Sequence, residues 1–149
     1  MEQAGNVAVG ASGAVGFSRA ALEAYSDKTF AEAEMDFWTI PYEFSELLSN
    51  DNNIDWLYKV PLIRHLGYID GMMEALIKVR FFAPHGEKLN KPENVGEFAG
   101  IMLRLKALFE DYSAGKKIEP SKMVEIVLDV ESDLDRFASS VMWELRRQE

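Results

Sequence analysis

The amino-acid sequence predicts an all-α protein, an up-down helical bundle with three long amphipathic helices and shorter N-terminal helices. Three observations support this fold class. Apolar residues recur in a 4-3 alternation in three successive segments after Pro61, proline and glycine interrupt the chain between those segments, and no segment carries the period-two alternation of a strand. With 149 residues, the chain is long enough to bury one core without disulfides or metal. We expect a single domain over residues 17–149, preceded by a flexible Gly/Ala-rich arm over residues 1–16.

The N-terminal part of this domain predicts short helices. Ser18 or Asp27 could cap helical segments over residues 19–25 and 28–38, and Thr39 precedes a further segment over residues 41–48. A loop then spans residues 49–53, and residues 54–59 form a short helical turn before Pro61. These segments supply aromatic and aliphatic side chains that can cover the open side of three long helices.

Each long helix is predicted by its apolar stripe. The first covers residues 61–82; the second starts near Pro92, with Asn90 as a possible cap, and stops at Gly115; the third starts at Pro120 and runs almost to the C-terminus. The stripes are Leu62, Leu66, Ile69, Met73 and Leu76; then Val95, Phe98, Met102, Leu105, Phe109 and Tyr112; then Met123, Val127, Val130, Leu134, Phe137 and Val141. Short connections predict antiparallel neighbours.

Composition limits the function classes. The net charge of −9 disfavours non-specific attachment to nucleic acid, because phosphate binding depends on clustered Lys and Arg, and it favours a basic protein as partner. Cysteine is absent, which excludes thiol nucleophiles and Cys-based zinc sites. Apolar stretches are too short to span a membrane, and no basic n-region opens the chain, so we expect a cytoplasmic protein.

The N-terminal stretch "VAVGASGAVG" resembles the opening of extended short-chain dehydrogenases, whose glycine-rich turn approaches a dinucleotide pyrophosphate. The resemblance covers about ten residues and implies a strand before the turn and a second strand ending in an acidic residue after it. Residues 25–38 read "YSDKTFAEAEMDFW", which offers no such strand. We therefore expect a flexible arm here and no bound cofactor.

Two G-x-x-x-G pairs lie inside the long helices: Gly67 with Gly71, and Gly96 with Gly100. Each interior glycine costs about 1 kcal/mol relative to alanine, so close contact must offset that cost. One interpretation is that aromatic side chains of the N-terminal region or the third helix fill these grooves. The other is that they form a docking groove for another protein or for a second copy of this chain.

Two histidines are candidates for chemistry. His65 has no carboxylate or histidine at a helical metal-ligand spacing, so we expect no metal site there. Arg80 and His85 stand five residues apart and resemble the R-x(4-6)-H signature of the HEPN ribonucleases, which are themselves helical bundles. That resemblance implies that Arg80 would stabilise an RNA phosphate and His85 would transfer a proton, although Phe81 stands where that family has a polar residue.

Four carboxylates crowd the third long helix at Asp129, Glu131, Asp133 and Asp135. Calcium loops need a glycine and a downstream glutamate at fixed spacing, and this run has neither. We expect most of the run to be solvated, with a salt-sensitive contact between Asp129 or Asp133 and a basic partner as the functional alternative.

The sequence therefore predicts a non-catalytic protein-interaction role without cofactor or metal, in which a small subunit, adaptor or inhibitor binds another protein or a second copy of itself. The candidate interaction residues are Gly67, Gly71, Gly96, Gly100, Asp129 and Asp133. Two alternatives stay open. One is a HEPN-like ribonuclease that uses Arg80 and His85, and the other is an acidic nucleic-acid mimic that blocks a nucleic-acid-binding protein.

Overall fold

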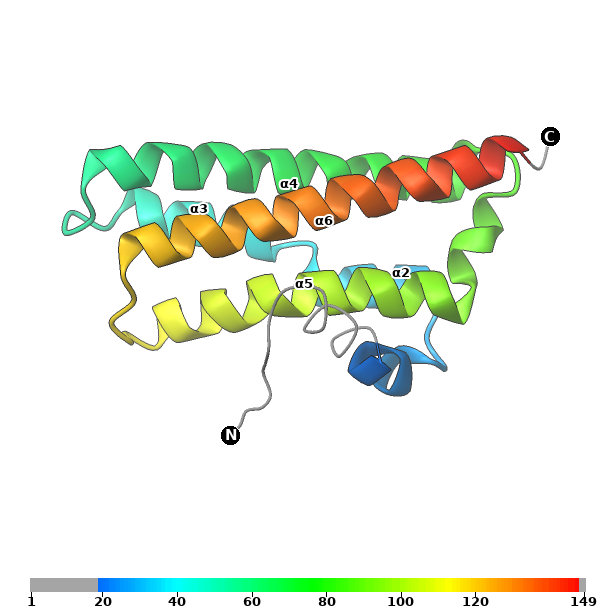
Figure 1. Ribbon diagram of the computed structural model, residues 1–149, viewed down its shortest axis with the longest axis horizontal. Coiled ribbons are helices and arrows are strands. Elements are labelled where there is room, and N and C mark those ends of the chain that lie inside the picture. The colour runs from blue at the N-terminus through cyan, green and yellow to red at the C-terminus, as the bar shows by residue number, and fades with distance from the viewer. Residues whose placement is uncertain (1–18, 148–149) are drawn as a thin grey trace.

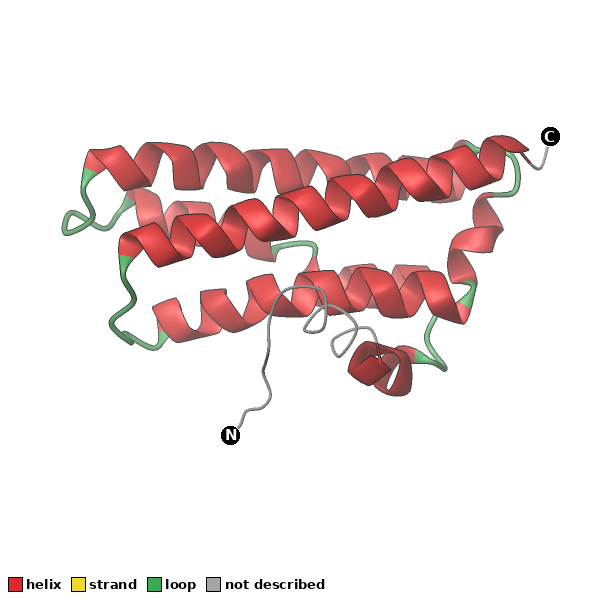
Figure 2. Ribbon diagram, in the orientation of Figure 1, coloured by secondary structure: helices red, strands yellow, loops and turns green. Residues whose placement is uncertain are grey.

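The computed structural model describes residues 19–147, which contain helices and connecting turns and no strand (Figure 2). The all-α prediction is confirmed, while the predicted Gly-rich arm lies outside the described residues. A short helix covers residues 19–25. It is followed by α2 (Phe30–Phe37), α3 (Ile40–Ser49), α4 (Trp56–Phe82), the 3-10 turn η1 (Gly86–Asn90), α5 (Pro92–Ser113) and α6 (Pro120–Arg147).

The helices form a bundle in which α2 and α3 together occupy one side (Figure 1). Helix α6 packs against both α4 and α5, α3 packs against α4, and α2 packs against α5. Helices α4 and α6 run in the same direction and α5 runs in the opposite direction (Figure 1). Although consecutive in the chain, α4 and α5 make their main contacts with other helices. The reason is that η1, which packs on α4, α5 and α6, carries the chain across the end of the bundle.

The core consists of the stripes that the 4-3 alternation predicts. All predicted stripe residues of α4 and α6 are buried, and on α5 only Phe109 and Tyr112 are half-buried. Aromatic rings from three helices meet in the core: the centroid of Phe30 on α2 lies 4.6 Å from Phe98 on α5 and 6.3 Å from Phe137 on α6. These contacts attach α2 to the long helices α5 and α6.

Pro61 lies inside α4, so the prediction of a separate helical turn before it is wrong. The helix begins at Trp56, where Asp55 Oδ1 accepts a hydrogen bond from the Leu57 amide at 2.9 Å. Pro61 is the sixth residue of the helix and removes only the one hydrogen bond that its missing amide would donate. A strong cap one residue before the helix lets the first turn form despite that loss.

The capping residues also differ from those predicted. Thr29, and not Asp27, caps α2 through a reciprocal pair of hydrogen bonds with Glu32. Asn90 does not cap α5, whose N-cap is Lys91. Instead, Asn90 Oδ1 accepts a hydrogen bond from the Phe30 amide at 2.8 Å. Asn90 therefore satisfies the first amide of α2 from 60 residues away.

None of the helices within residues 19–147 is both long enough and apolar enough to cross a membrane.

Candidate functional site

Helix α4 has two faces with different roles. One buries the predicted stripe in the core, and the other lies along the outer edge of the bundle (Figure 1). The exposed face carries a second 4-3 alternation, which we call the α4 outer stripe. Its residues, all exposed, are Leu57, Val60, Arg64, Gly67, Gly71, Glu74, Lys78 and Phe81.

Apolar residues on this outer stripe make α4 unlike α6. Helix α6 is strongly amphipathic. Helix α4 has apolar residues on both of its faces, so that neither face is clearly more apolar than the other. The prediction of three amphipathic helices therefore holds for α4 only on its core side. Helices α6 and α3 both pack against α4, and neither of them covers the outer stripe, whose residues stay exposed.

The middle of the outer stripe is open. A Cβ atom built on Gly67 or Gly71 would meet nothing within 4 Å, and both glycines are exposed. No side chain of the described residues fills this groove, so the interpretation of aromatic filling does not apply to this pair. Among residues 19–147, neither glycine is required by a turn or by an internal contact.

The second glycine pair is inside the molecule. Gly96 and Gly100 are buried on α5, and a Cβ on Gly96 would lie 2.6 Å from Cδ2 of Leu22. The short helix of residues 19–25 therefore packs directly on Gly96. The groove is filled from the N-terminal region, as one interpretation predicts, but the filling side chain is aliphatic. Gly96 is thus not an open docking position.

Both ends of α4 expose large apolar side chains. At the N-terminal end, Trp56 and Leu57 are each 72% exposed, and at the C-terminal end Phe81 and Phe82 are 65% and 82% exposed. Clusters of this kind on a folded chain mark interaction surfaces more often than isolated apolar residues do. The α4 outer stripe is therefore apolar at its ends, charged between, and open in the middle.

Arg80, one of the two residues of the HEPN-like motif, is bound inside the molecule. Its Nη2 lies 3.0 Å from Oε1 of the buried Glu34 on α2, and its guanidinium stacks on Phe81 with the ring centroid at 4.3 Å. His85 is exposed in the α4–η1 turn, where its φ is 62°. The structure thus gives Arg80 a carboxylate partner and places His85 in solvent.

Glu34 is the only buried charged residue of the described part of the chain, at 3% exposure. Burial raises the pKa of Glu34 to about 6, and the nearby Arg80 opposes that rise. Its Oε2 atom is buried without a hydrogen-bond partner among the described residues. The sequence pattern does not indicate that Glu34 is buried, because a glutamate on an amphipathic segment is expected on the solvent side.

The acidic run of α6 is divided between two roles. Glu131 Oε1 lies 2.5 Å from Nδ1 of His65, which joins α6 to α4. Asp133 bonds Arg104 of α5, and its other oxygen bonds Arg136 at 3.1 Å. Asp129 and Asp135 are exposed. Within residues 19–147, no three His, Cys, Asp or Glu side chains gather in a way that could hold a metal ion.

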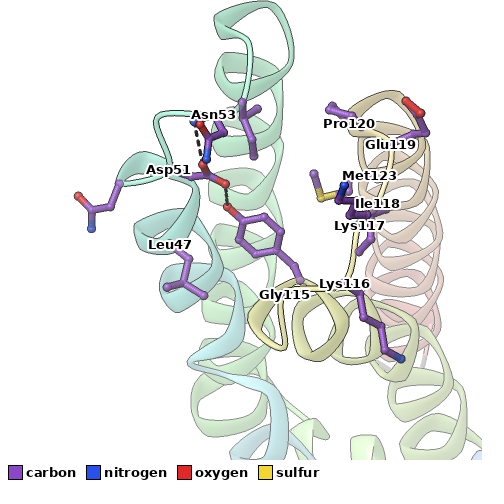
Figure 3. Close-up of a pocket in the computed structure, with 13 residues that line it drawn as sticks. Leu47, Asp51, Asn53, Gly115, Lys116, Lys117, Ile118, Glu119, Pro120 and Met123 are labelled. Carbon is purple, nitrogen blue, oxygen red and sulfur yellow. Dashed lines mark hydrogen bonds between the residues drawn. The ribbon is translucent and has the colours of Figure 1, made fainter.

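A pocket of about 780 Å³ lies at one end of the bundle (Figure 3). It is lined by the end of α3 and the α3–α4 loop on one side and by the α5–α6 connection on the other. The Tyr112 hydroxyl donates a hydrogen bond to Asp51 Oδ2 at 2.5 Å, and burial together with this bond raises the pKa of Tyr112. Tyr112 therefore stays protonated and fastens the α3–α4 loop to α5. The sequence pattern does not indicate this pocket, because its lining comes from loops that are separated along the chain.

Comparison of the chain with protein-family models, with curated proteins and with solved structures finds no match.

Proposed function

We propose that the protein has a non-catalytic, protein-binding role, as a small subunit, adaptor or inhibitor, and that it binds through the α4 outer stripe. The observation that carries this proposal is the pair of open glycines, Gly67 and Gly71, in the middle of an exposed helix face.

The cost of these glycines supports the proposal. Each interior glycine destabilises a helix by about 1 kcal/mol relative to alanine, and no contact within the described part of the chain requires a glycine at these two positions. A Cβ-free surface lets the backbone of another helix approach more closely than any side chain would allow. The isolated bundle gives no physical reason for these glycines, whereas a binding partner would supply one.

The ribonuclease alternative has less support. Catalysis on RNA would need Arg80 to hold a phosphate, yet its charge is already neutralised by Glu34 at 3.0 Å. The mimic alternative is also weakened, because Glu131 and Asp133 bind residues of this chain and leave fewer free carboxylates. An RNA cleavage assay on the wild type and on His85→Ala tests the first of these. Activity that disappears in the variant would favour the ribonuclease.

The proposal is tested by affinity purification of the tagged chain from its native host. The wild type is compared with Gly71→Leu, which places a large side chain on the open surface between Gly67 and Gly71, and with Ser139→Leu, which places the same side chain at an exposed position on α6. We expect the co-purifying protein to be lost with Gly71→Leu and kept with Ser139→Leu, while circular dichroism stays the same for all three. Equal capture by all three proteins would contradict the proposal.

A further inference from the structure

We propose that the α4 outer stripe binds a second copy of this chain, so that two α4 helices pack antiparallel across a two-fold axis. This inference deepens the proposed function and rests on the same surface. It names the occupant, which the exposure of the stripe alone does not.

The spacing of the stripe fits a helix pair. Its residues follow the 4-3 alternation that lines the seam of two packed helices, and the seam extends over seven turns of α4 without interruption. In an antiparallel pair with a two-fold axis, each layer of the seam occurs twice, once on either side of the axis. The stripe is therefore compatible with itself only if its two halves are complementary.

The two halves are complementary when the axis is level with Ile69, midway between Gly67 and Gly71. In the central layers glycine then meets glycine, which permits close approach of the two backbones. The outermost layers bring together apolar side chains that are more than half exposed in the monomer. The four layers are Gly67 with the partner's Gly71, Arg64 with the partner's Glu74, Val60 with the partner's Lys78, and Leu57 with the partner's Phe81.

The charged layer gives the pairing its direction. Arg64 and Glu74 are exposed, and the ion pairs within residues 19–147 include neither of them. In the proposed pair each finds an opposite charge on the other copy. The stem of Lys78 can cover Val60 while its ammonium group stays in water.

Other registers lose this complementarity. Moving the seam by one heptad, which is two layers, places Arg64 against the partner's Gly67 or Phe81, and Glu74 against the partner's Leu57 or Gly71. Each shifted register also leaves one apolar end without a facing residue. The only like-charge contact in the proposed register is at Asp70, which meets its own copy at the exposed rim, where such pairs cost little.

The test is the molar mass of the purified full chain, measured by sedimentation equilibrium over a range of micromolar concentrations. We expect a species of twice the 16.9 kDa of one chain, in equilibrium with the monomer. Arg64→Glu and Glu74→Arg each place like charges in two layers and should weaken the dimer by about tenfold or more. The double variant restores opposite charges in reversed order and should recover most of the affinity.

A mass of 16.9 kDa at all concentrations would overturn the inference, and so would a dimer that neither single variant weakens. Circular dichroism controls for the fold, since both residues are exposed and form no ion pair with another residue of the described range. A monomeric protein that still loses its host partner with Gly71→Leu would leave the proposed function standing. If the chain is a dimer but Gly71→Leu captures the same host proteins as the wild type, the proposed function is contradicted.

Discussion

Nη2 of Arg80 lies 3.0 Å from Oε1 of Glu34, and this pair joins the last turns of α4 to α2. The two side chains are 21% and 4% exposed, so water screens the pair little. Burial of the carboxylate outweighs the attraction of the guanidinium, because the pKa of Glu34 is raised to about 6 from its ordinary 4.5. The contact therefore positions the two helices at a cost in electrostatic free energy at neutral pH.

The raised pKa predicts how stability depends on pH. Between pH 4.5 and 6 the folded chain holds a proton on Glu34 that the unfolded chain has released. The contribution of Glu34 to the free energy of unfolding therefore falls as pH rises. The loss amounts to about 2 kcal/mol. Urea denaturation from pH 4 to 7 should show the free energy of unfolding of the wild type falling by this amount relative to that of Glu34→Gln, whose side chain does not titrate. A difference that stays constant with pH would contradict the assignment.

Tyr112→Phe should lower the free energy of unfolding by about 1 kcal/mol, because it removes a hydrogen bond to the carboxylate of Asp51. The matched control is Tyr42→Phe, which removes an exposed hydroxyl from Glu46 within one helix and should change stability by less than about 0.5 kcal/mol. Thermal or chemical denaturation measures both. Equal effects of the two variants would show that Tyr112 does not fasten the loop.

Gly96→Ala should destabilise the bundle by about 1–3 kcal/mol, because the new Cβ would lie 2.6 Å from the Leu22 side chain. Gly67→Ala is the control, since its Cβ meets open space and should stabilise the monomer by up to about 1 kcal/mol. Adding Leu22→Ala to Gly96→Ala relieves the clash, so the double variant should lose less than the sum of the single losses. Additive losses would show that the two residues do not press on each other.

Asp133→Asn should destabilise the chain by about 1 kcal/mol, because Asp133 bonds Arg104 across α5 and α6. Asp129→Asn should have almost no effect on stability, since Asp129 is exposed. If the acidic run binds a basic partner, Asp129→Asn should instead weaken that binding at low salt. Denaturation curves of both variants separate the two roles, and a larger loss of stability from Asp129→Asn would contradict them.

The long helices could be predicted from the sequence because each carries one uninterrupted apolar stripe that the core buries. The helix boundaries were less predictable where two rules compete. Pro61 indicates a helix boundary by its missing amide, yet the Asp55 cap starts α4 five residues earlier than that rule implies. Asn90 has the right side chain for a cap, but which helix it caps depends on a contact with Phe30 from a distant part of the chain.

The candidate site was predicted in part. Gly67 and Gly71 stood out by their cost in a helix, and the structure distinguishes them from Gly96, which Leu22 covers. The full outer stripe was not recognised, because the stronger buried stripe of α4 hides a second alternation that only exposure reveals. The burial of Glu34 depends on how α2 sits against α4, and no local pattern contains that information.

Disulfide trapping between two copies tests the central claim most directly, because the chain has no cysteine of its own. Chains carrying Gly67→Cys are mixed with chains carrying Gly71→Cys, oxidised mildly and digested for mass spectrometry. The account predicts a cross-link between position 67 of one chain and position 71 of the other, in greater yield than from either variant alone or from a Ser139→Cys control. A mixture without this cross-link, or one that links no better than the control, would contradict the pairing of α4 with its own copy.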